Sequence, residues 1–460
     1  MFDSMLTAVN YLVQGMNLAY LALGVVVGLM FGSIPGLGGA TAIALLLPLT
    51  FGMEPDQAII LMGGIMGAVS IGGSVSAILI NTPGTAPNAA TCIDGYPLTK
   101  QGKAGIAIGA AATASSIGGV LSVAFLVMML PVARTVVLWF GPPAFFMLAA
   151  LGGNERYTAG IEFLWDGISI VPLLIGLFAI AEMLELYRKK GSIAPPVRVD
   201  ASQLRGTREG VLATLRSPGT VFSGSLIGTF IGAVPGVGGT VASFLSYSFT
   251  AQTSRDTSKF GAGDIRGVIA PEAANNAKDG GALIPTLAFG IPGSAEMAIF
   301  LGVLILHGID PGPMLLIERE STIFMLILAL LAATLLSAGI VLSSARFLAR
   351  IADIDTQILI PCVLTVSFVG AYSLHGSLGD VFVAAFFGVL GYLMVRLGYP
   401  RITLVIAFVL SGLMERNFMQ SMIMFRGDWR GFFTDTVTVV LLALSMLALT
   451  VPVFRRLRGR

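Results

Sequence analysis

The chain has 460 residues, of which 55% are hydrophobic and only 11% are charged, and its net charge is +2. Soluble proteins carry roughly 25% charged residues, so this chain cannot cover its surface with polar groups and is predicted to be an integral membrane protein. Its apolar runs are continuous rather than alternating, which predicts membrane helices and not a β-barrel. The near-neutral charge argues against a nucleic-acid partner.

The first part of the chain, residues 1–183, is predicted to be a membrane repeat. Its apolar run from 18 to 51 is interrupted by a proline–glycine motif. The glycine-rich run 58–80 follows, and such small residues allow helices to approach closely in lipid. The uncharged run 104–130 is long enough to span a bilayer, and 168–181 is expected to add another span.

Residues 184–217 are predicted to be a cytoplasmic linker between two halves of the chain. Seven Lys and Arg residues stand against three Asp and Glu residues in this stretch. Because basic residues collect in the cytoplasmic loops of membrane proteins, this linker is placed in the cytoplasm. The basic end of the chain, 455–460, is placed there for the same reason.

Residues 218–460 are predicted to be a second membrane repeat. The run 222–231, a second proline–glycine motif and the run 243–249 repeat the order seen in residues 18–51. Further apolar runs lie at 282–289, 321–342, 358–369, 381–395, 402–413 and 436–454. The two homologous repeats predict an all-α polytopic membrane protein with re-entrant or broken helices and about 10–12 membrane segments.

The charges of matching loops favour an inverted arrangement of the two repeats. Glu54 and Asp56 follow the first broken segment, whereas Arg255, Lys259 and Arg266 follow the second. Opposite charge at matching loops is expected when the copies have opposite orientations. If the linker and the second of these loops are both cytoplasmic, the segment between them is a re-entrant hairpin. Otherwise it crosses once; we favour the hairpin.

Two nearly identical motifs are the first candidates for a binding site. Broken helices at matching places in two halves are typical of transporter sites, although glycines for packing and a proline kink are the structural alternative. Converging backbone N–H groups and helix N-termini at such breaks can hold a carboxylate. The candidate substrate ligands here are Pro35, Gly36, Gly38, Gly39, Pro235, Gly236, Gly238 and Gly239.

A second pair of breaks comes after the next apolar run of each copy. Its alternative interpretation is a surface loop built from turn residues. The hydroxyl and amide side chains offer donors for carboxylate oxygens and acceptors for a small cation. The candidate substrate ligands are Asn81, Thr82, Pro83, Gly84, Pro292, Gly293 and Ser294, and the candidate sodium ligands are Ser33, Thr85, Asn275 and Asn276. Polar groups within the bilayer are typical of function, but residues 275–279 also fit a solvated helix end.

No motif in the sequence indicates an enzyme. No Ser/His/Asp, H-E-x-x-H or Walker pattern is placed for chemistry, so no catalytic residue is predicted and no cofactor beyond a coupling sodium ion. His307 and His375 lack the spacing of a metal site, and Cys92 and Cys362 are expected to be free thiols.

The motifs occur together in an order that is specific to one family. Besides the breaks, the chain contains Asp94-Gly95-Tyr96-Pro97-Leu98 and Pro271-Glu272-Ala273-Ala274-Asn275-Asn276. Over nearly its whole length it resembles the large permease subunit of the tripartite tricarboxylate transporters. The resemblance implies a bacterial inner-membrane importer of citrate or related carboxylates, typically driven by sodium. It also implies two partners, a small four-helix membrane subunit and a periplasmic solute-binding protein.

The expected function is therefore secondary-active, sodium-coupled uptake of tricarboxylates or related organic carboxylates. The two copies would bring their breaks together near the midplane, and one bundle would slide against the other in an elevator-like motion. One alternative is a carrier that works without partners on another small solute. The other is an anion channel that uses the breaks as a selectivity filter.

Overall fold

The structure is a computed structural model that describes residues 2–35, 37–139, 141, 143–144, 168–189, 206–351, 356–434 and 436–443. Every regular element in these residues is helical, which confirms the predicted all-α class. Part of the predicted linker, 190–205, and the basic end, 455–460, lie outside the described residues.

Six of the described helices are long and apolar enough to cross a membrane. They are Gly15–Ser33, Pro55–Ile80, Ala104–Val137, Ile170–Arg188, Glu320–Ser344 and Leu378–Arg396. Shorter apolar helices lie at Gly38–Gly52, Ala295–Leu306, Gln357–Ser373 and Arg401–Ser411. The chain is accordingly a multi-pass membrane protein.

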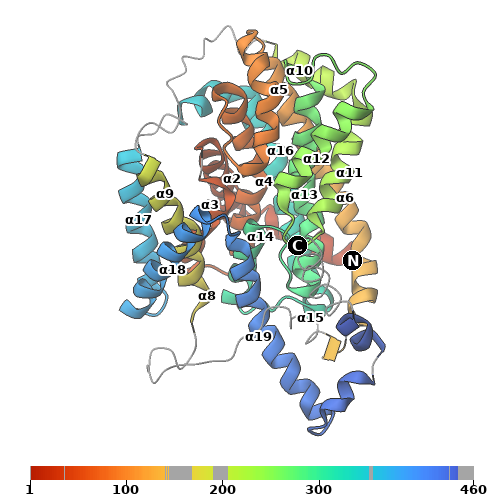
Figure 1. The fold of residues 1–460 in the computed structure, drawn as a ribbon, viewed down its shortest axis with the longest axis vertical. Coiled ribbons are helices and arrows are strands. Elements are labelled where there is room, and N and C mark those ends of the chain that lie inside the picture. The colour runs from red at the N-terminus through yellow and green to blue at the C-terminus, as the bar shows by residue number, and fades with distance from the viewer. Residues whose placement is uncertain are drawn as a thin grey trace, which may run out of the picture.

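The helices of the first half extend across Figure 1, from α8 and α9 on the left through α2, α4 and α5 to α6 on the right. In order they are α1 (Phe2–Leu12), α2 (Gly15–Ser33), α3 (Gly38–Leu46), η1 (Leu47–Gly52), α4 (Pro55–Ile80), η2 (Ala86–Asn88), α5 (Ala89–Lys100), α6 (Ala104–Val137), α8 (Ile170–Leu174), the π-helix η5 (Ile175–Ile180) and α9 (Ala181–Lys189).

The helices of the second half are α10 (Thr207–Leu215), α11 (Pro218–Gly232), α12 (Gly238–Thr253), α13 (Arg266–Phe289), α14 (Ala295–Leu306), α15 (Pro313–Glu318), α16 (Glu320–Ile351), α17 (Thr356–Ser373), α18 (Leu378–Arg396), α19 (Arg401–Met424) and η6 (Trp429–Phe433). Among them, α11, α12, α13, α14 and α16 follow the order of α2, α3, α4, α5 and α6.

The ends of the helices follow from proline and from residues that tolerate left-handed backbone. α2 ends ahead of Pro35, because the residue before proline is driven into an extended conformation, as Ile34 is here (φ −85°, ψ 114°). α4 ends at Asn81 with φ 55°, and α13 ends at Gly290 with φ 68°. Asn and Gly are the residues that most readily adopt this helix-ending conformation.

Glycines bring α2 against α4 and α11 against α13 in the same way. A Cβ atom added to Gly28 would lie 2.6 Å from the carbonyl oxygen of Ile65, and one added to Gly224 would lie 2.6 Å from that of Ala270. The full stripes that face the neighbouring backbone are Gly24, Gly28 and Gly32 on α2, and Gly224, Gly228 and Gly232 on α11. The homologous halves thus use matching small-residue faces for close helix packing.

The long helix of each half packs on the central helix of the other half. α6 lies along α13, and α16 lies along α4. Gly67 of α4 sits so close to α16 that an added Cβ would be 2.6 Å from the Leu330 carbonyl oxygen. Gly118 of α6 would likewise collide with the Ala273 carbonyl oxygen of α13. The two halves are therefore interlocked and share one core.

In the segment around Pro235, α11 and α12 form a helical hairpin, and its re-entrant placement in the membrane stays a prediction. α11 and α12 pack against each other on either side of the proline, and an added Cβ on Gly224 would lie 3.1 Å from Ser246 Oγ. The Ser246 hydroxyl donates to the Ala270 carbonyl at 2.8 Å, which fixes the hairpin to α13.

A lateral group of helices stands beside this interlocked bundle. η5, α9, α17 and α18 pack together, and Figure 1 shows them with α8 to one side of α2 and α4. Gly176 of η5 meets α18 closely, since an added Cβ would be 2.8 Å from Phe387 Cβ. α3 contacts η5 and joins the lateral group to the main bundle.

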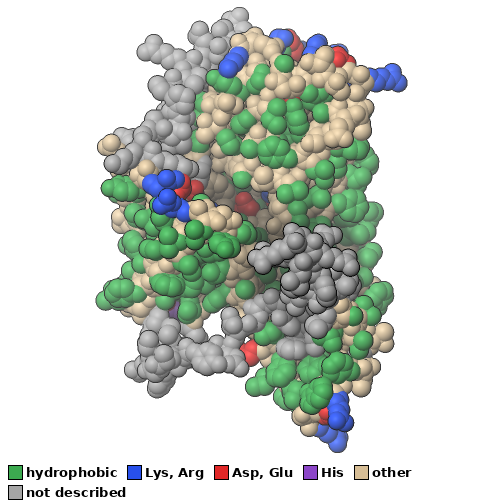
Figure 2. Space-filling view, viewed as in Figure 1, with side chains coloured by type: hydrophobic (Ala, Val, Ile, Leu, Met, Phe, Trp, Pro, Cys, Tyr) green, Lys and Arg blue, Asp and Glu red, His purple; other side chains and the backbone are tan. Residues whose placement is uncertain are grey.

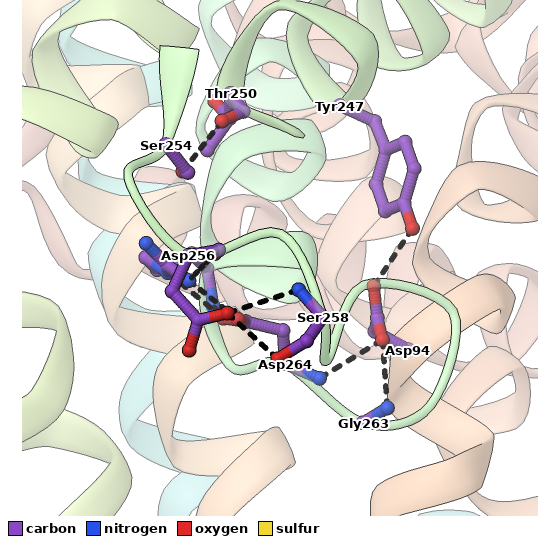
Figure 3. Close-up of polar contacts among 9 residues, drawn as sticks. Asp94, Tyr247, Thr250, Ser254, Asp256, Ser258, Gly263 and Asp264 are labelled. Atoms are coloured by element: carbon purple, nitrogen blue, oxygen red, sulfur yellow. Dashed lines mark hydrogen bonds and ion pairs between the residues drawn. The ribbon is translucent and has the colours of Figure 1, made fainter. Parts of the chain in front are cut away.

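A buried carboxylate ties the polar loop of the second half to the first half. Asp94 of α5 is fully buried and accepts hydrogen bonds from Tyr247 Oη (2.9 Å), Gly263 N (2.8 Å) and Asp264 N (2.9 Å) (Figure 3). The loop also carries an exposed turn in which Ser258 donates to Asp256.

Replacing Asp94 with alanine is expected to loosen this loop. Two backbone N–H groups lose their acceptor, which costs about 2 kcal/mol of unfolding free energy. We expect a lower melting temperature in detergent and faster tryptic cleavage at Arg255 and Lys259, both exposed. Asp256→Ala is the matched control, because its carboxylate is exposed and only orders its own turn. Equal cleavage rates in the two variants would contradict the assigned role of Asp94.

Candidate binding site

Both proline–glycine motifs and both second breaks open onto one cavity of about 860 Å³. Figure 2 shows this face of the molecule hollowed in its middle, with an acidic side chain visible in the hollow. The predicted residues that line it are Pro35, Gly38, Gly39, Thr82, Pro83, Gly84, Thr85, Gly236, Gly238, Gly239, Gly293 and Ser294. The remaining walls come from η5, α9 and the α18–α19 connection, so the cavity lies between the main bundle and the lateral group.

The proline–glycine motifs need glycine for their backbone conformation. Gly38, Gly236 and Gly238 have φ values of 56°, 77° and 74°, and nothing lies within 4 Å of a Cβ added to any of them. Packing therefore leaves room for a side chain, while the left-handed backbone disfavours one. α3 begins at Gly38 and α12 at Gly238, so two helix N-termini border the cavity, where their free N–H groups favour an anion.

The second breaks are part of this cavity, and the surface-loop alternative is wrong for them. Gly84 is buried, and an added Cβ would collide with the Gly32 carbonyl oxygen. Gly293 approaches Gly232 in the same way, with the corresponding carbonyl oxygen 2.6 Å from an added Cβ. Ser294 caps α14 by accepting a hydrogen bond from Met297 N at 3.3 Å.

Several candidates are described but do not line the cavity. These are Asn81, Pro235, Pro292, Ser33, Asn275 and Asn276, while Gly36 lies outside the described residues. Asn81 is the exposed end of α4, and the Ser33 hydroxyl donates to the Gly72 carbonyl at 3.2 Å. For Ser33, that bond already engages the hydroxyl in helix packing.

The polar stretch near residue 275 is not a solvated helix end. Asn275 and Asn276 are 1% and 3% exposed inside α13, which runs unbroken from Arg266 to Phe289. Ser70 Oγ donates to Asn275 Oδ1 at 3.5 Å. Neither Asn275 Nδ2 nor Asn276 Oδ1 has a partner among the described residues. An unpaired, buried amide oxygen is a suitable ligand for a hard cation, so Asn276 fits the predicted sodium role chemically.

Four charged side chains line the cavity, and among them only Lys278 lies in a stretch, 275–279, that the sequence singled out. They are Glu182, Lys278, Glu296 and Arg401. Lys278 is 5% exposed and its Nζ donates to Asp279 Oδ1 at 2.6 Å. Arg401 pairs with Glu182 at 3.1 Å and donates to the Leu177 carbonyl at 3.0 Å. A lysine in an apolar helix is recognisable in the sequence, but the other three come from elements that only the fold brings here.

Another buried carboxylate, that of Glu272, lies nearer the N-terminal end of α13 than Lys278, and both of its oxygens accept hydrogen bonds. Glu272 Oε1 accepts from Thr91 Oγ1 (2.5 Å) and Asn88 Nδ2 (3.2 Å). Its Oε2 accepts from Ser74 Oγ (2.5 Å) and Ser115 Oγ (2.9 Å). All four donors belong to the first half, so Glu272 holds α4, η2, α5 and α6 around α13.

Comparison with known proteins places this architecture in one family. The model described as the tripartite tricarboxylate transporter TctA family matches residues 18–153 and 150–406. The chain is 31% identical to an uncharacterised 52.8 kDa protein in the TAR-I ttuC' 3' region of Agrobacterium vitis, over 100% of this chain and 96% of that protein. It is 32% identical to an uncharacterised protein in the TAR-II ttuC' 3' region of the same organism, over 51% of this chain and 96% of that protein.

No solved structure matches the chain. The family match covers most of the sequence and includes both proline–glycine motifs and both second breaks. With its helical, multi-pass architecture, the chain belongs to the tripartite tricarboxylate transporter TctA family, whose members transport tricarboxylates as part of multi-subunit systems.

Proposed function

We propose that the protein is the large permease subunit of a binding-protein-dependent system that imports tricarboxylates or related organic carboxylates by sodium symport. The observation that carries the proposal is that four separate chain breaks, two from each half, line one cavity. Irregular backbone at membrane depth is tolerated only where it is buried or borders such a cavity. The cavity is therefore the proposed site at which the substrate is held.

The lining of the cavity suits a carboxylate. The N-termini of α3 and α12 supply backbone donors, and Ser294 adds a hydroxyl group. The hydroxyl groups of Thr82 and Thr85 also line the cavity, but they already donate to the Ile80 carbonyl and to Asn88 Oδ1. Lys278 provides a positive charge that is shielded from lipid. A carboxylate can be held in this way by fixed dipoles and one cation, which together replace the water it leaves behind.

Charge balance supports cation coupling. Among the described lining residues, the positive Lys278 and Arg401 are matched by the negative Glu182 and Glu296. A substrate with two or three negative charges adds charge that this lining does not neutralise. Burying unpaired charge is expensive, so one or more cations are expected to enter with the anion. Thr85 lines the cavity and Asn276 has an unpaired oxygen, and both are proposed sodium ligands.

The proposed setting is the bacterial inner membrane. A small four-helix membrane subunit and a periplasmic solute-binding protein are the proposed partners, and the 184–217 linker and the C-terminus are assigned to the cytoplasm. Because the cavity lies between the main bundle and the lateral group, a sliding of one against the other would expose it alternately. We retain an inverted relation between the halves as part of this proposal.

Uptake into proteoliposomes tests the function. The protein, its small subunit and a cognate binding protein should accumulate labelled citrate against its gradient only when sodium is supplied outside. Gly38→Leu and Gly238→Leu force side chains onto left-handed backbone at the cavity wall and should each reduce uptake about tenfold or more. Gly52→Ala serves as the control, because open space surrounds Gly52 outside the cavity.

Each other outcome has a defined meaning for the proposal. Uptake that needs no binding protein would indicate an independent carrier. Downhill flux that sodium cannot drive uphill would indicate a channel. Unchanged uptake in both leucine variants would remove the glycine breaks from the mechanism.

A further inference from the structure

The two proline–glycine motifs occupy matching positions but have differently charged neighbours. Gly32 of α2 meets the backbone of Val69, and Gly232 of α11 meets the backbone of Lys278. Val69 and Lys278 therefore stand at equivalent places on the central helices α4 and α13. The repeat that looks symmetric in its glycines has valine in one copy and lysine in the other.

The last glycine of each motif shows this difference directly. An added Cβ on Gly39 would lie 3.0 Å from Val69 Cγ1 of its own half and 3.0 Å from Glu296 Cγ of the other half. On Gly239 the added Cβ would meet the Lys278 side chain of its own half, and would lie 3.0 Å from Pro87 Cγ of the other. Thus an acid stands beside the first motif, and a base that is paired with Asp279 and lies within electrostatic range of that acid stands beside the second.

Lys278 retains capacity to bind a ligand. Its ammonium group carries three N–H donors. Of the described side chains, only Asp279 accepts a hydrogen bond from it. Lys278 is also 5% exposed and borders the cavity beside the N-terminus of α12. A carboxylate in the cavity can therefore receive a charged donor and backbone N–H groups from the same side.

Glu296 makes the first motif unfavourable for an anion. Its Oε1 would be 3.4 Å from a Cβ on Gly39, so its carboxylate lies at the N-terminal end of α3 and lines the cavity. A substrate carboxylate placed there would face a like charge at short range. The helix N-terminus at Gly38 is consequently already next to an anionic group.

We propose that the substrate carboxylate binds asymmetrically, on the Gly239 side of the cavity, with Lys278 as its charged ligand, and that Glu296 excludes it from the Gly39 side. This goes beyond the symmetric site expected from the sequence, in which both motifs hold the anion. It rests on the proposed function, because it assigns the residue that recognises the transported carboxylate.

Citrate binding to the purified full-length protein tests this assignment. Affinity is measured by isothermal titration in detergent with sodium present, for wild type, Lys278→Met, Lys278→Arg and Glu296→Gln. Lys278→Met should weaken citrate binding about tenfold or more, because a charge-assisted hydrogen bond is lost. Lys278→Arg keeps the charge and should recover most of the affinity. Glu296→Gln removes a like charge and should tighten binding about threefold.

The controls separate this assignment from the proposed function. Lys100→Met removes an exposed lysine that packs over the Tyr96 ring and should bind citrate as wild type does. Wild-type affinity in Lys278→Met, or unchanged or weaker binding in Glu296→Gln, would overturn the asymmetric site while leaving carboxylate transport intact. If Lys278→Met does not fold, the affinity of Glu296→Gln still tests the asymmetric site. Absence of binding by wild type to citrate, tartrate and succinate would overturn both.

Discussion

Glu272→Leu is expected to destabilise the protein by about 3 kcal/mol or more and to lower its yield from membranes sharply. The Thr91 hydroxyl has no other acceptor among the described residues, and the Ser115 hydroxyl keeps only the Glu272 backbone carbonyl at 3.4 Å. Asn88 loses a charged acceptor but keeps Ser70 O and Ser74 Oγ. Ser74 can fall back on the Ser70 carbonyl, to which it already donates at 3.0 Å, so its loss is smaller. Leucine cannot accept any of these bonds.

The measurement is the apparent melting temperature of the purified protein, together with its elution profile in size-exclusion chromatography. Glu272→Gln should give an intermediate value, because its amide keeps one acceptor oxygen and the facing hydroxyl groups can rotate to accept from its nitrogen. Glu318→Leu removes an exposed acid at the C-terminal end of α15 and is the matched control. If Glu272→Leu has the same melting temperature as this control, the hydrogen-bond network around Glu272 contributes little to stability.

Gly84→Ala is the second substitution with a large expected effect. Its Cβ would overlap the Gly32 carbonyl oxygen and lie 2.5 Å from Gly73 Cα, and both are backbone atoms of packed helices. Backbone cannot move aside as a flexible side chain does, so we expect a loss of about 3 kcal/mol or complete failure to fold. The readout is the amount of monodisperse protein recovered and its melting temperature.

Two further alanine variants calibrate this result. Gly293→Ala should be damaging but less so, since its closest neighbours, the Gly232 carbonyl oxygen and Ala282 Cβ, stand at 2.6 and 2.9 Å. Gly339→Ala lies in α16 with open space around it and should be neutral or slightly stabilising, because alanine favours helix. Normal yield and stability of Gly84→Ala would mean that α2 and α4 are less tightly packed than described.

Much of the fold could be predicted because the helices and their ends depend on local sequence patterns. Long uncharged runs gave the spanning helices, and Pro35 and Pro235 marked the breaks in both copies. Loop charge favoured a re-entrant hairpin around Pro235; α11 and α12 do pack against each other, and the side on which they enter the membrane stays a prediction. Asn81 and Gly290 were recognisable as turn residues, and they do end α4 and α13.

The charged part of the site could not be predicted in the same way. Glu182 and Arg401 are distant in sequence and meet only because the lateral group packs beside the α18–α19 connection. Lys278 and Asp279 fitted either a functional site within the bilayer or a solvated helix end, and the structure buries both inside α13, where they pair with each other. Whether a polar stretch is buried depends on the helices that pack around it, here α6 and α11 around α13, and a single sequence does not show that packing.

The crossing of the long helices has a consequence for biosynthesis. α4 is complete early, yet the face that contains Gly67 is covered only by α16, which the ribosome makes much later. We therefore expect the face of α4 around Gly67 to reach its final packing only after α16 has been inserted. The four donors of the first half that bind Glu272 likewise gain this acceptor only after α13 has been made. Because α13 and α16 are made late, we expect the helix packing of the first half to be completed only after the second half has been inserted.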